Sequence, residues 1–327
     1  MNGPAMTTDL QQARLEPRAH TRASVEELAR RYSTWGRWGA DDELGAANHV
    51  TQETVRHAAG LVRRGAVFPL ALPLEGDGPQ LGAGGRVNPQ HVMLRTPAEE
   101  MFDDGGLVRF SDDAVYMALQ CSTQWDALCH IFYDGQAYNG RDFSSVGAVT
   151  GARHNSITNL TDRAAGRGVL LDVGRFVGRE LEPGESIQRE HLEACAQAQG
   201  VQVGTGDFVL VRTGQMTQRR GAWGDFSGGP APGLGVSTAD FLCPRDVVAV
   251  ATDTWGIEAL PYEAPDVVAP LHVILLAYAG IYIGEMWDLD ALAADCAADG
   301  VYEFFLTAPP LTITGSVGSP ITPLAIK

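Results

Sequence analysis

Short apolar runs between glycine-rich turns dominate the pattern of hydrophobic and polar positions along the chain. GVLLDV at 168–173 and DFVLVRT at 207–213 are aliphatic runs bounded by glycine or charge, which is typical of buried strands. Residues 188–199 between them form a helix candidate that ends at Gly200, and VVAVAT at 247–252 adds another buried strand. A strand, a helix and a strand in this order predict a crossover unit and therefore an α/β fold.

Capping residues and turn signals predict the other elements. Ser24 and Glu27 have the spacing of a capping box and predict a short helix through Arg31. Thr51 is the expected cap of a second helix, which runs to about residue 64. The same signals predict strands at 66–74, 91–95 and 114–119, helices at 271–279 and 289–298, and strands over the last thirty residues.

Polar groups concentrate in the stretch from Leu119 to Gly140, LQCSTQWDALCHIFYDGQAYNG. The expected strand at 114–119 leads directly into it, so we expect these side chains at the end of a strand of a rigid sheet. Burying polar atoms is costly unless partners or a ligand satisfy them, which favours a reactive pocket. A polar turn is the plain alternative. The Gly- and Pro-rich loop at 75–89 is long enough to form a lid.

The chain has the organisation of one domain. A length of 327 residues, with 45% hydrophobic and 20% charged residues, is ordinary for a globular protein with a sizeable core. We find no internal repeat and no linker. We therefore expect a flexible N-terminal arm at 1–22 and a single catalytic domain at 23–327.

Charge and cysteine usage narrow the partners and the compartment. A net charge of −16 disfavours nucleic acid and anionic membranes, because both carry phosphates. Five cysteines without C-x-x-C spacing indicate reduced thiols, and the N-terminus does not look like a signal peptide. The apolar run at 271–283 is too short to span a bilayer. We expect a cytoplasmic protein that binds a small molecule, with no nucleic acid and no membrane.

Two groups of side chains, far apart in sequence, are the candidates for chemistry. They are Gln120, Gln124, Asp126 and His130 in the polar stretch, and His272 with Glu285 further along. A carboxylate and an imidazole from each group would make a metal cage or an acid/base pair. Taken singly, a histidine on an apolar helix is more often a core residue, and a glutamate after a strand is more often a surface charge.

Aromatic and thiol groups beside the polar stretch have two interpretations. Trp125, Phe132 and Tyr133 would favour a flat or aromatic substrate, although aromatic side chains at this spacing also form cores. Cys121 and Cys129 would be nucleophiles only if activated, and buried thiols are mostly inert. The sequence contains no G-x-S-x-G elbow, P-loop, G-x-G-x-x-G or H-E-x-x-H, which argues against serine hydrolase, nucleotide and zincin chemistry.

The polar stretch resembles a motif of the cyclase or kynurenine formamidase-like metal hydrolases, a family that includes arylformamidases and isatin hydrolases. Its members carry the pattern H-x-G-T-H-x-D-x-P-x-H, and the equivalent text here is QCSTQWDALCH, from Gln120 to His130. Further segments look like family landmarks in family order: WGADDELGAANHVT, GVLLDV, LVRTG, ATDTWGIE and PLHVILLAYAGIYIGE. The resemblance therefore covers roughly residues 30–310.

The resemblance implies a swivelling β/β/α fold with a mixed sheet and flanking helices, assembled as a homodimer or homotetramer. It also implies hydrolysis of an amide, lactam or related acyl bond. In the family, two motif histidines and the aspartate bind zinc or manganese, the last motif histidine transfers protons, and a later histidine and glutamate complete the site. Four residues of this chain match those positions: Asp126, His130, His272 and Glu285.

Gln120 and Gln124 stand where the family has metal-binding histidines, and this departure leaves the cofactor open. An imidazole is a good donor to zinc or manganese, whereas a glutamine carbonyl is a weaker oxygen donor. A cage of both glutamines with Asp126, His272 and Glu285 would still suit a divalent metal. The expected cofactor is therefore manganese or zinc, with a metal-free site as an equal alternative.

Three functions fit these residues. The main hypothesis is a hydrolase of a C–N or C–O acyl bond in a small cyclic or aromatic metabolite, with Asp126 and His130 as acid and base. An alternative is a metal-independent cyclase, dehydratase or isomerase, in which Gln120 and Gln124 donate hydrogen bonds to the substrate. A second alternative is a non-catalytic binding protein, which would have no need of four costly ionisable groups.

Overall fold

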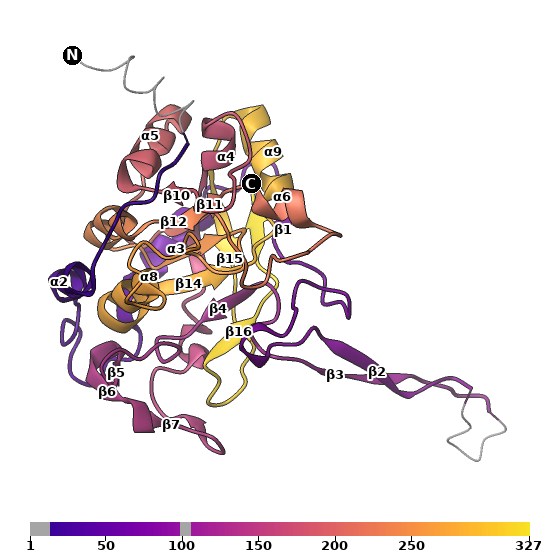
Figure 1. Ribbon diagram of the computed structural model, residues 1–327. Helices are drawn as coiled ribbons and strands as arrows, with labels where there is room; N and C mark the ends of the chain where they lie inside the picture. Colours follow the sequence, from indigo (N-terminus) through magenta and orange to yellow (C-terminus); the bar gives the residue numbers. More distant parts are fainter. Residues whose placement is uncertain (1–13, 99–105) are drawn as a thin grey trace.

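The apolar runs form the centre of one mixed sheet in the computed structural model, which describes residues 14–98 and 106–327 (Figure 1). The mixed α/β architecture expected from the sequence is confirmed, with helices flanking the sheet. Nine strands are hydrogen-bonded in the spatial order β1 (Val67–Pro69), β17 (Leu324–Ile326), β15 (Glu303–Thr307), β9 (Ala165–Asp172), β11 (Phe208–Arg212), β13 (Ala249–Thr252), β14 (Tyr282–Glu285), β4 (Gln124–Asp126) and β16 (Gly318–Pro320).

Four parallel strands, β9, β11, β13 and β14, form the middle of this sheet. Their aliphatic side chains are buried, because a parallel sheet is covered on both faces. The expected crossover is present, with α4 (Val173–Phe176) and α5 (Arg189–Gln199) between β9 and β11. As predicted, α5 ends at Gly200, whose φ of 66° is the left-handed conformation that glycine adopts readily.

Antiparallel strands extend the sheet on both sides. β15 pairs with β9 and is followed outward by β17 and β1. On the other side, β4 pairs with β14, and β16 pairs with β4. The polar stretch therefore enters the sheet through β4, next to the last parallel strand.

The helices cover the sheet and one another. α3 (Gln52–Ala59) packs on β9, and α2 (Arg22–Tyr32) packs on the apolar π-helix η8 (Val273–Ala279). The expected helices at 271–279 and 289–298 are present as α8 (Pro270–His272) with η8, and as α9 (Asp290–Asp299). Further elements include α6 (Gln215–Arg219), α7 (Ala239–Leu242) and the short strand pairs β5 (Gln136–Ala137) with β6 (Arg141–Asp142), β7 (Val146–Gly147) with β8 (Gly151–Ala152), and β10 (Ser186–Ile187) with β12 (Gly233–Leu234). Within the described ranges, every helix is too short or too polar to cross a bilayer.

Two helix boundaries differ from the expectation. Thr21 rather than Ser24 is the N-cap of α2, because the Thr21 hydroxyl accepts from the Ser24 amide at 3.3 Å and the Ser24 hydroxyl accepts from the Thr21 amide at 3.0 Å. Thr51 caps α3 as predicted, but this helix ends at Ala59. The residues after it turn away so that β1 can pair with β17, which is a tertiary contact that the local pattern does not contain.

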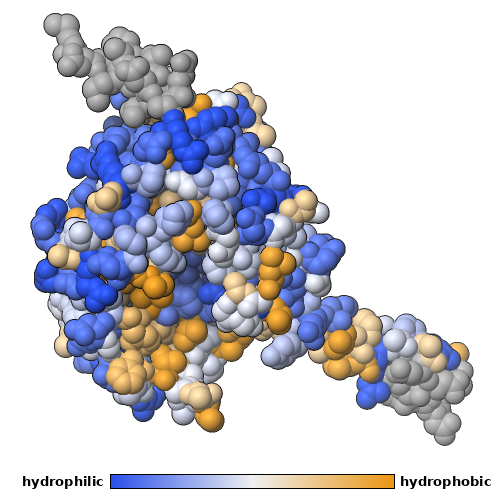
Figure 2. Space-filling model, in the orientation of Figure 1, coloured by the Kyte–Doolittle hydropathy of each residue, from blue (hydrophilic) through white to orange (hydrophobic). Residues whose placement is uncertain are grey.

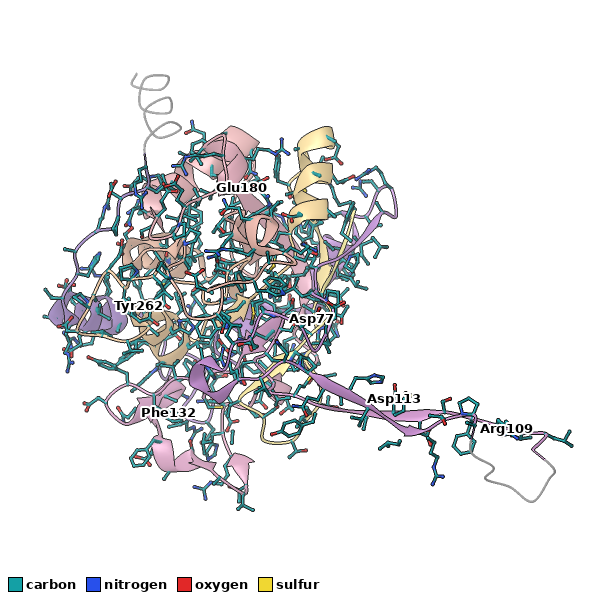
Figure 3. All side chains as sticks on the ribbon, turned by 45° about the vertical axis from the view of Figure 1, so that its right-hand side comes forward. Asp77, Arg109, Asp113, Phe132, Glu180 and Tyr262 are labelled. Atoms are coloured by element: carbon teal, nitrogen blue, oxygen red, sulfur yellow. The ribbon has the colours of Figure 1, made fainter. Side chains whose placement is uncertain are left out.

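Strands β2 (Gln90–Arg95) and β3 (Asp112–Tyr116) form a two-stranded arm that leaves the body of the molecule (Figure 1). Asp113, labelled in Figure 3, lies on this projecting part. Every residue of both strands is exposed. The prediction that the strand at 114–119 belongs to the main sheet and carries the polar cluster at its end is therefore wrong. Alternation of side chains identifies a strand but not the sheet that it joins.

The N-terminal arm predicted at 1–22 lies partly outside the described residues. The segment that is described, 14–21, is fixed to the body rather than free. Leu15 is buried, its amide donates to Glu185 Oε1 at 2.8 Å, and its carbonyl accepts from the Ser186 amide at 2.8 Å. Further along, the His20 amide donates to the Glu263 carbonyl at 2.9 Å. These contacts are made with residues far away in sequence, which a local pattern does not show.

Candidate active site

Strands β4 and β14 bring the two groups of candidate residues together. They pair antiparallel, with Gln124 opposite Glu285 and Asp126 opposite Ile283. Successive side chains of a strand point to opposite faces, so Gln124 and Asp126 share one face. Trp125 points to the other face, where its indole donates to the Ala308 carbonyl at 2.9 Å.

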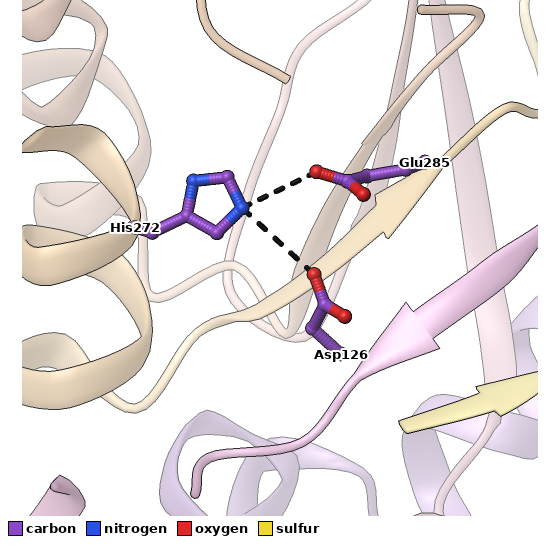
Figure 4. Close-up of side chains that lie close together, drawn as sticks. All are labelled: Asp126, His272 and Glu285. Atoms are coloured by element: carbon purple, nitrogen blue, oxygen red, sulfur yellow. Dashed lines mark hydrogen bonds and ion pairs between the residues drawn. The ribbon is translucent and has the colours of Figure 1, made fainter. Parts of the chain in front are cut away.

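His272, on α8, points toward the two carboxylates (Figure 4). Its Nε2 lies 3.2 Å from Glu285 Oε1 and 3.8 Å from Asp126 Oδ2. One ligand atom from each of the three residues lies within 4.8 Å of the others, and all three side chains are buried. We call Asp126, His272 and Glu285 the triad. Its two oxygen donors and one imidazole form a donor set suited to manganese or zinc.

The carboxylate of Asp126 is the least satisfied group of the triad. It is fully buried, and neither of its oxygens has a hydrogen-bond partner among the described residues. Burial raises the pKa of Asp126 well above its usual value and the charge of Glu285 raises it further, although His272 acts in the opposite direction. A buried carboxylate in this state is costly, so the site needs a proton, a cation or a hydrogen-bonding ligand at this position. A metal ion fits this requirement.

Glu258 orients the imidazole of the triad. Its Oε2 lies 3.0 Å from His272 Nδ1, and its Oε1 accepts from the backbone amides of Leu271 and His272 at 2.8 and 2.9 Å. With Nδ1 directed at a carboxylate, Nε2 is the nitrogen that faces Asp126 and Glu285. Burial alone would lower the pKa of His272, but the carboxylates of Glu258 and Glu285 raise it well above its usual value. The surroundings therefore favour positive charge at Nε2.

Gln124 supports Glu285. The Gln124 amide nitrogen donates to Glu285 Oε2 at 2.7 Å, which holds the other oxygen, Oε1, toward His272. Gln124 Oε1 is buried without a partner in the described part of the chain, and it is the oxygen that this side chain would offer to a cation. Gln120 is placed differently, since its amide nitrogen lies over Gly318 of β16, where a Cβ would come within 2.5 Å of it. The two glutamines therefore do not have equivalent positions.

His130 adds a second imidazole at the rim of the triad. Its Nε2 is 3.7 Å from Asp126 Oδ1. Burial, together with the charge of His272, lowers the pKa of His130 to about 4. The ring is therefore neutral near pH 7 and is able to accept a proton.

A cavity of about 170 Å³ opens beside His130, His272 and Glu285. Its other lining residues are Arg86, Ile131, Trp255, Gly256, Glu258, Leu260, Tyr262 and Ala269. No sequence signal singles out Arg86, Tyr262 or Glu258. The only hints were the long loop at 75–89, which contains Arg86, and the segment ATDTWGIE, which contains Trp255 and Glu258.

The aromatic residues proposed as substrate contacts are not at this cavity. Trp125 is fully buried in the core against Trp287, with ring centroids 4.7 Å apart, so its assignment to substrate binding is wrong. Phe132 and Tyr133 are half-buried against the core, and the Tyr133 hydroxyl donates to Glu26 of α2 at 2.7 Å. Phe132 lies near β5 and β6, as the labelled side chain in Figure 3 shows. The aromatic walls of the cavity are instead Trp255 and Tyr262.

The two thiols of the polar stretch have the surroundings of packing groups. Cys121 and Cys129 are buried, and burial raises the pKa of both, to about 12 for Cys129. Nucleophilic cysteines need a depressed pKa, so neither thiol is activated here.

A larger hollow of about 510 Å³ lies elsewhere, over the ends of β9 and β11. Its central cation, Arg212, is paired with Asp172 at 3.1 Å, Glu180 at 2.9 Å and Asp290 at 3.0 Å. Because each of these three carboxylates is ion-paired with Arg212, this hollow has the character of a structural ion-pair network. The triad, with its unsatisfied carboxylate, is the better candidate for chemistry.

A mixed sheet that holds a buried cluster of Asp, His and Glu beside a cavity has the arrangement of an enzyme active site. The model of the Cyclase family, described as "Putative cyclase", matches residues 44–259. A solved structure described as a novel cyclase is 39% identical, with a TM-score of 0.83, and the match covers 91% of this chain and 99% of that one. The chain belongs to the Cyclase family, which confirms the resemblance seen in the sequence.

Two more distant structures share the fold. Isatin hydrolase A from Ralstonia solanacearum is 21% identical with a TM-score of 0.60, over 83% of this chain and 94% of that one. A predicted metal-dependent hydrolase from Bacillus stearothermophilus is 19% identical with a TM-score of 0.52, over 80% and 97%. No curated protein matches the chain.

Proposed function

We propose that this protein is a hydrolase that cleaves a C–N or C–O acyl bond, in an amide, a lactam or a lactone, of a small cyclic or aromatic metabolite. The observation that carries the proposal is the buried carboxylate of Asp126, which has no hydrogen-bond partner among the described residues and faces His272. A structural carboxylate would be satisfied by its neighbours. One that is left unsatisfied beside a cavity is prepared for a ligand or a cation.

Asp126, His272 and Glu285 would hold a divalent metal, with Gln124 Oε1 as a further oxygen donor. When bound, such an ion lowers the pKa of a water molecule and polarises an acyl oxygen. The manganese or zinc expected from the sequence both suit carboxylate and imidazole donors. Glu258 would keep the imidazole in the correct tautomer, and Gln124 would keep Glu285 in place.

Proton transfer falls to His130. Its ring lies at the cavity, 3.7 Å from Asp126, and its lowered pKa keeps it neutral near pH 7. A neutral imidazole can take a proton from an attacking water molecule and give it to the leaving nitrogen or oxygen. Trp255 and Tyr262 would pack against a flat substrate.

The relatives support the reaction class. One is described as an isatin hydrolase and another as a predicted metal-dependent hydrolase. Isatin is an aromatic cyclic amide, which is the kind of substrate that the present cavity would suit.

Metal content and chelation test the proposal. We expect the purified protein to contain close to one equivalent of manganese or zinc by elemental analysis. It should hydrolyse members of a panel of formamides, lactams and lactones, lose this activity on chelation and regain it when the metal is returned. Asp126→Asn should lower turnover by about 100-fold or more, because it removes a charged ligand. Asp113→Asn is the control, since that exposed aspartate also lies beside a histidine, at 2.8 Å, but on the arm.

The metal-independent cyclase, dehydratase or isomerase is the second candidate. It is favoured by one contact, the hydrogen bond from Gln124 to Glu285, because an amide in place of an imidazole stabilises that carboxylate without any metal. Metal-free protein that converts a substrate at full rate would select this function and refute the hydrolase mechanism. Tight ligand binding without turnover across the whole panel would instead indicate a binding protein.

A further inference from the structure

The loop at 75–89 is built to hold one residue at the cavity. Its two stems are clamped together, because the Gln80 amide donates to Asn88 Oδ1 at 2.8 Å and Asn88 Nδ2 donates to the carbonyls of Gly78 and Gln80 at 3.0 and 3.1 Å. The buried side chain of Gln80 donates to the Cys121 carbonyl at 2.8 Å and accepts from Trp255 Nε1 at 3.2 Å. The loop is therefore attached both to the polar stretch and to the cavity wall.

Glycines between the stems turn the chain back toward the cavity. Gly82, Gly84 and Gly85 have φ values of 94°, 63° and 77°, a region that other residues adopt at a cost. Arg86 follows directly, and its guanidinium lies over the ring of Trp255, 5.3 Å from the centroid. A cation on an aromatic face is attracted by the negative potential of the ring, which favours this position of the guanidinium.

Arg86 is a cation in an acidic cavity. Glu258 and Glu285 line the same space, and Asp126 lies close enough to feel the charge of Arg86. In the described ranges, no carboxylate lies within ion-pairing distance of its guanidinium. The contrast with Arg37 is informative, because Arg37 also lies over a tryptophan, at 4.8 Å, but is paired with Asp246 at 2.9 Å. The guanidinium group of Arg86 carries five N–H donors at the cavity and has no anionic partner there among the described residues, so it is suited to binding an anion.

We propose that Arg86 binds a carboxylate group of the substrate or product, so that the substrate class is a small aromatic or cyclic acyl compound whose carboxylate lies against Trp255. This inference rests on the proposed function and adds the charge of its ligand. An anion that approaches three carboxylates in a protein of net charge −16 is repelled, and the guanidinium of Arg86 reduces this repulsion at the cavity.

Equilibrium binding of two matched probes, benzoate and benzamide, tests the proposal without requiring turnover. Binding is measured by calorimetry on the full chain after chelation, so that no metal competes for the carboxylate. We expect wild type to bind benzoate more tightly than benzamide, and Arg86→Gln to weaken benzoate binding by about 10- to 100-fold, the range for a charge-assisted hydrogen-bonded pair. Benzamide binding should not change.

Two further variants make the result decisive. Arg37→Gln removes an arginine over a tryptophan elsewhere and should leave both affinities unchanged. Arg86→Lys keeps the charge but loses the fork, so benzoate affinity should be intermediate. Equal weakening of both probes in Arg86→Gln, or no preference for benzoate in wild type, overturns the proposal. A failed binding test with successful metal-dependent hydrolysis would leave the proposed function standing.

Once a substrate is found, kinetics will show whether the carboxylate at Arg86 belongs to the substrate or is formed by hydrolysis. If the substrate carries it, Arg86→Gln raises KM for the carboxylated compound and leaves KM for its methyl ester unchanged. If hydrolysis creates it, KM is unchanged and inhibition by the product is relieved. Lowered kcat with unchanged KM and unchanged product inhibition would refute both forms.

Discussion

Glu258 acts on the site through His272. Replacing it with glutamine separates the effect of its negative charge from the effect of its hydrogen bonds to the backbone. In Glu258→Gln the side-chain oxygen can still accept from the amides of Leu271 and His272, but the negative charge beside His272 Nδ1 is lost. We predict that affinity for manganese or zinc falls by about 10- to 100-fold, as is usual when a carboxylate that supports a ligand histidine is removed. Competition with a metal-sensitive dye measures this affinity directly.

Glu263→Gln is the matched control for that experiment. Glu263 is similarly buried, and it accepts from the amides of Arg18 and Val236 at 2.7 Å in both cases, neither of which belongs to the triad. Its replacement should reduce stability and leave metal affinity unchanged. If Glu258→Gln binds metal as tightly as wild type, the orienting role assigned to Glu258 is wrong.

At the residue scale, the sequence identified the residues of the triad but not those that support them. Asp126, His272 and Glu285 were found because a family motif surrounds each of them. Glu258 ends the segment ATDTWGIE and Arg86 lies in the loop at 75–89, but their roles exist only through the contacts that the fold creates. The assignment of Trp125 to substrate binding fails for a related reason. Adjacent residues of a strand point to opposite faces of the sheet, so Trp125, next to Asp126, points away from the cavity.

At the element scale, the segment 14–21 depends on Glu185. This buried carboxylate accepts from the Leu15 amide at 2.8 Å, from the Glu182 amide at 2.7 Å and from Arg179 at 2.6 and 2.7 Å. Burial alone would raise the pKa of Glu185, but the Arg179 contacts and the backbone amides lower it below its usual value. We predict that Glu185→Gln reduces the free energy of unfolding by about 1 to 3 kcal/mol at pH 7.

The pH dependence follows from the sign of that shift. Because the pKa of Glu185 is lower in the folded state than in the unfolded state, its stabilisation is complete above the unfolded value and is lost as pH falls through the folded value. The difference between wild type and Glu185→Gln in urea denaturation should stay nearly constant from pH 7 to about 5 and shrink as pH falls below about 4. Glu182→Gln, which changes an exposed ion pair with Arg14, should cost under about 0.5 kcal/mol. An unchanged difference at low pH would contradict the assignment.

Elements were predicted well where the signal is local and poorly where it is not. The Thr51 cap and the Gly200 stop were found because each satisfies the backbone of its own helix. The end of α3 and the fixing of Leu15 were missed, because both depend on strands or carboxylates far away along the chain. The placement of β3 failed for the same reason.

On the scale of the whole molecule, the arm of β2 and β3 exposes apolar side chains that no other part of the described chain covers. Its exposed apolar side chains include Val92, Leu94, Val115 and Tyr116, and Figure 2 shows hydrophobic residues along it. Val92 and Val115 lie on opposite faces of the ribbon. Val115 pairs with His91, the residue before Val92, and successive residues of a strand point to opposite faces. A two-stranded ribbon with both faces in water is marginally stable, so we expect a second copy of the chain to cover it.

We predict a homodimer or homotetramer that depends on the arm. Replacing residues 91–115 with a short Gly-Ser linker should lower the number of chains per assembly, as measured by sedimentation equilibrium, because the apolar contacts between subunits are removed. Val92→Asp with Val115→Asp should have the same effect without shortening the chain. The exchange Asp112→Asn with Asp113→Asn, on the same strand, is the control and should leave the mass unchanged. The same number of chains per assembly in wild type and in the linker variant would refute this prediction.

The position of β4 also affects the order in which the molecule forms. Asp126 is flanked by Ile283 on one side and Gly318 on the other, so its strand has no neighbour before residue 285 is synthesised and only one before residue 318. The parallel strands β9 and β11 come from nearby segments and can pair earlier. Closing long loops is entropically costly and slow, so the polar stretch stays hydrated through the early stages of folding. Its carboxylate is then dehydrated in one of the last steps, when the imidazole and the second carboxylate that face it are already in place.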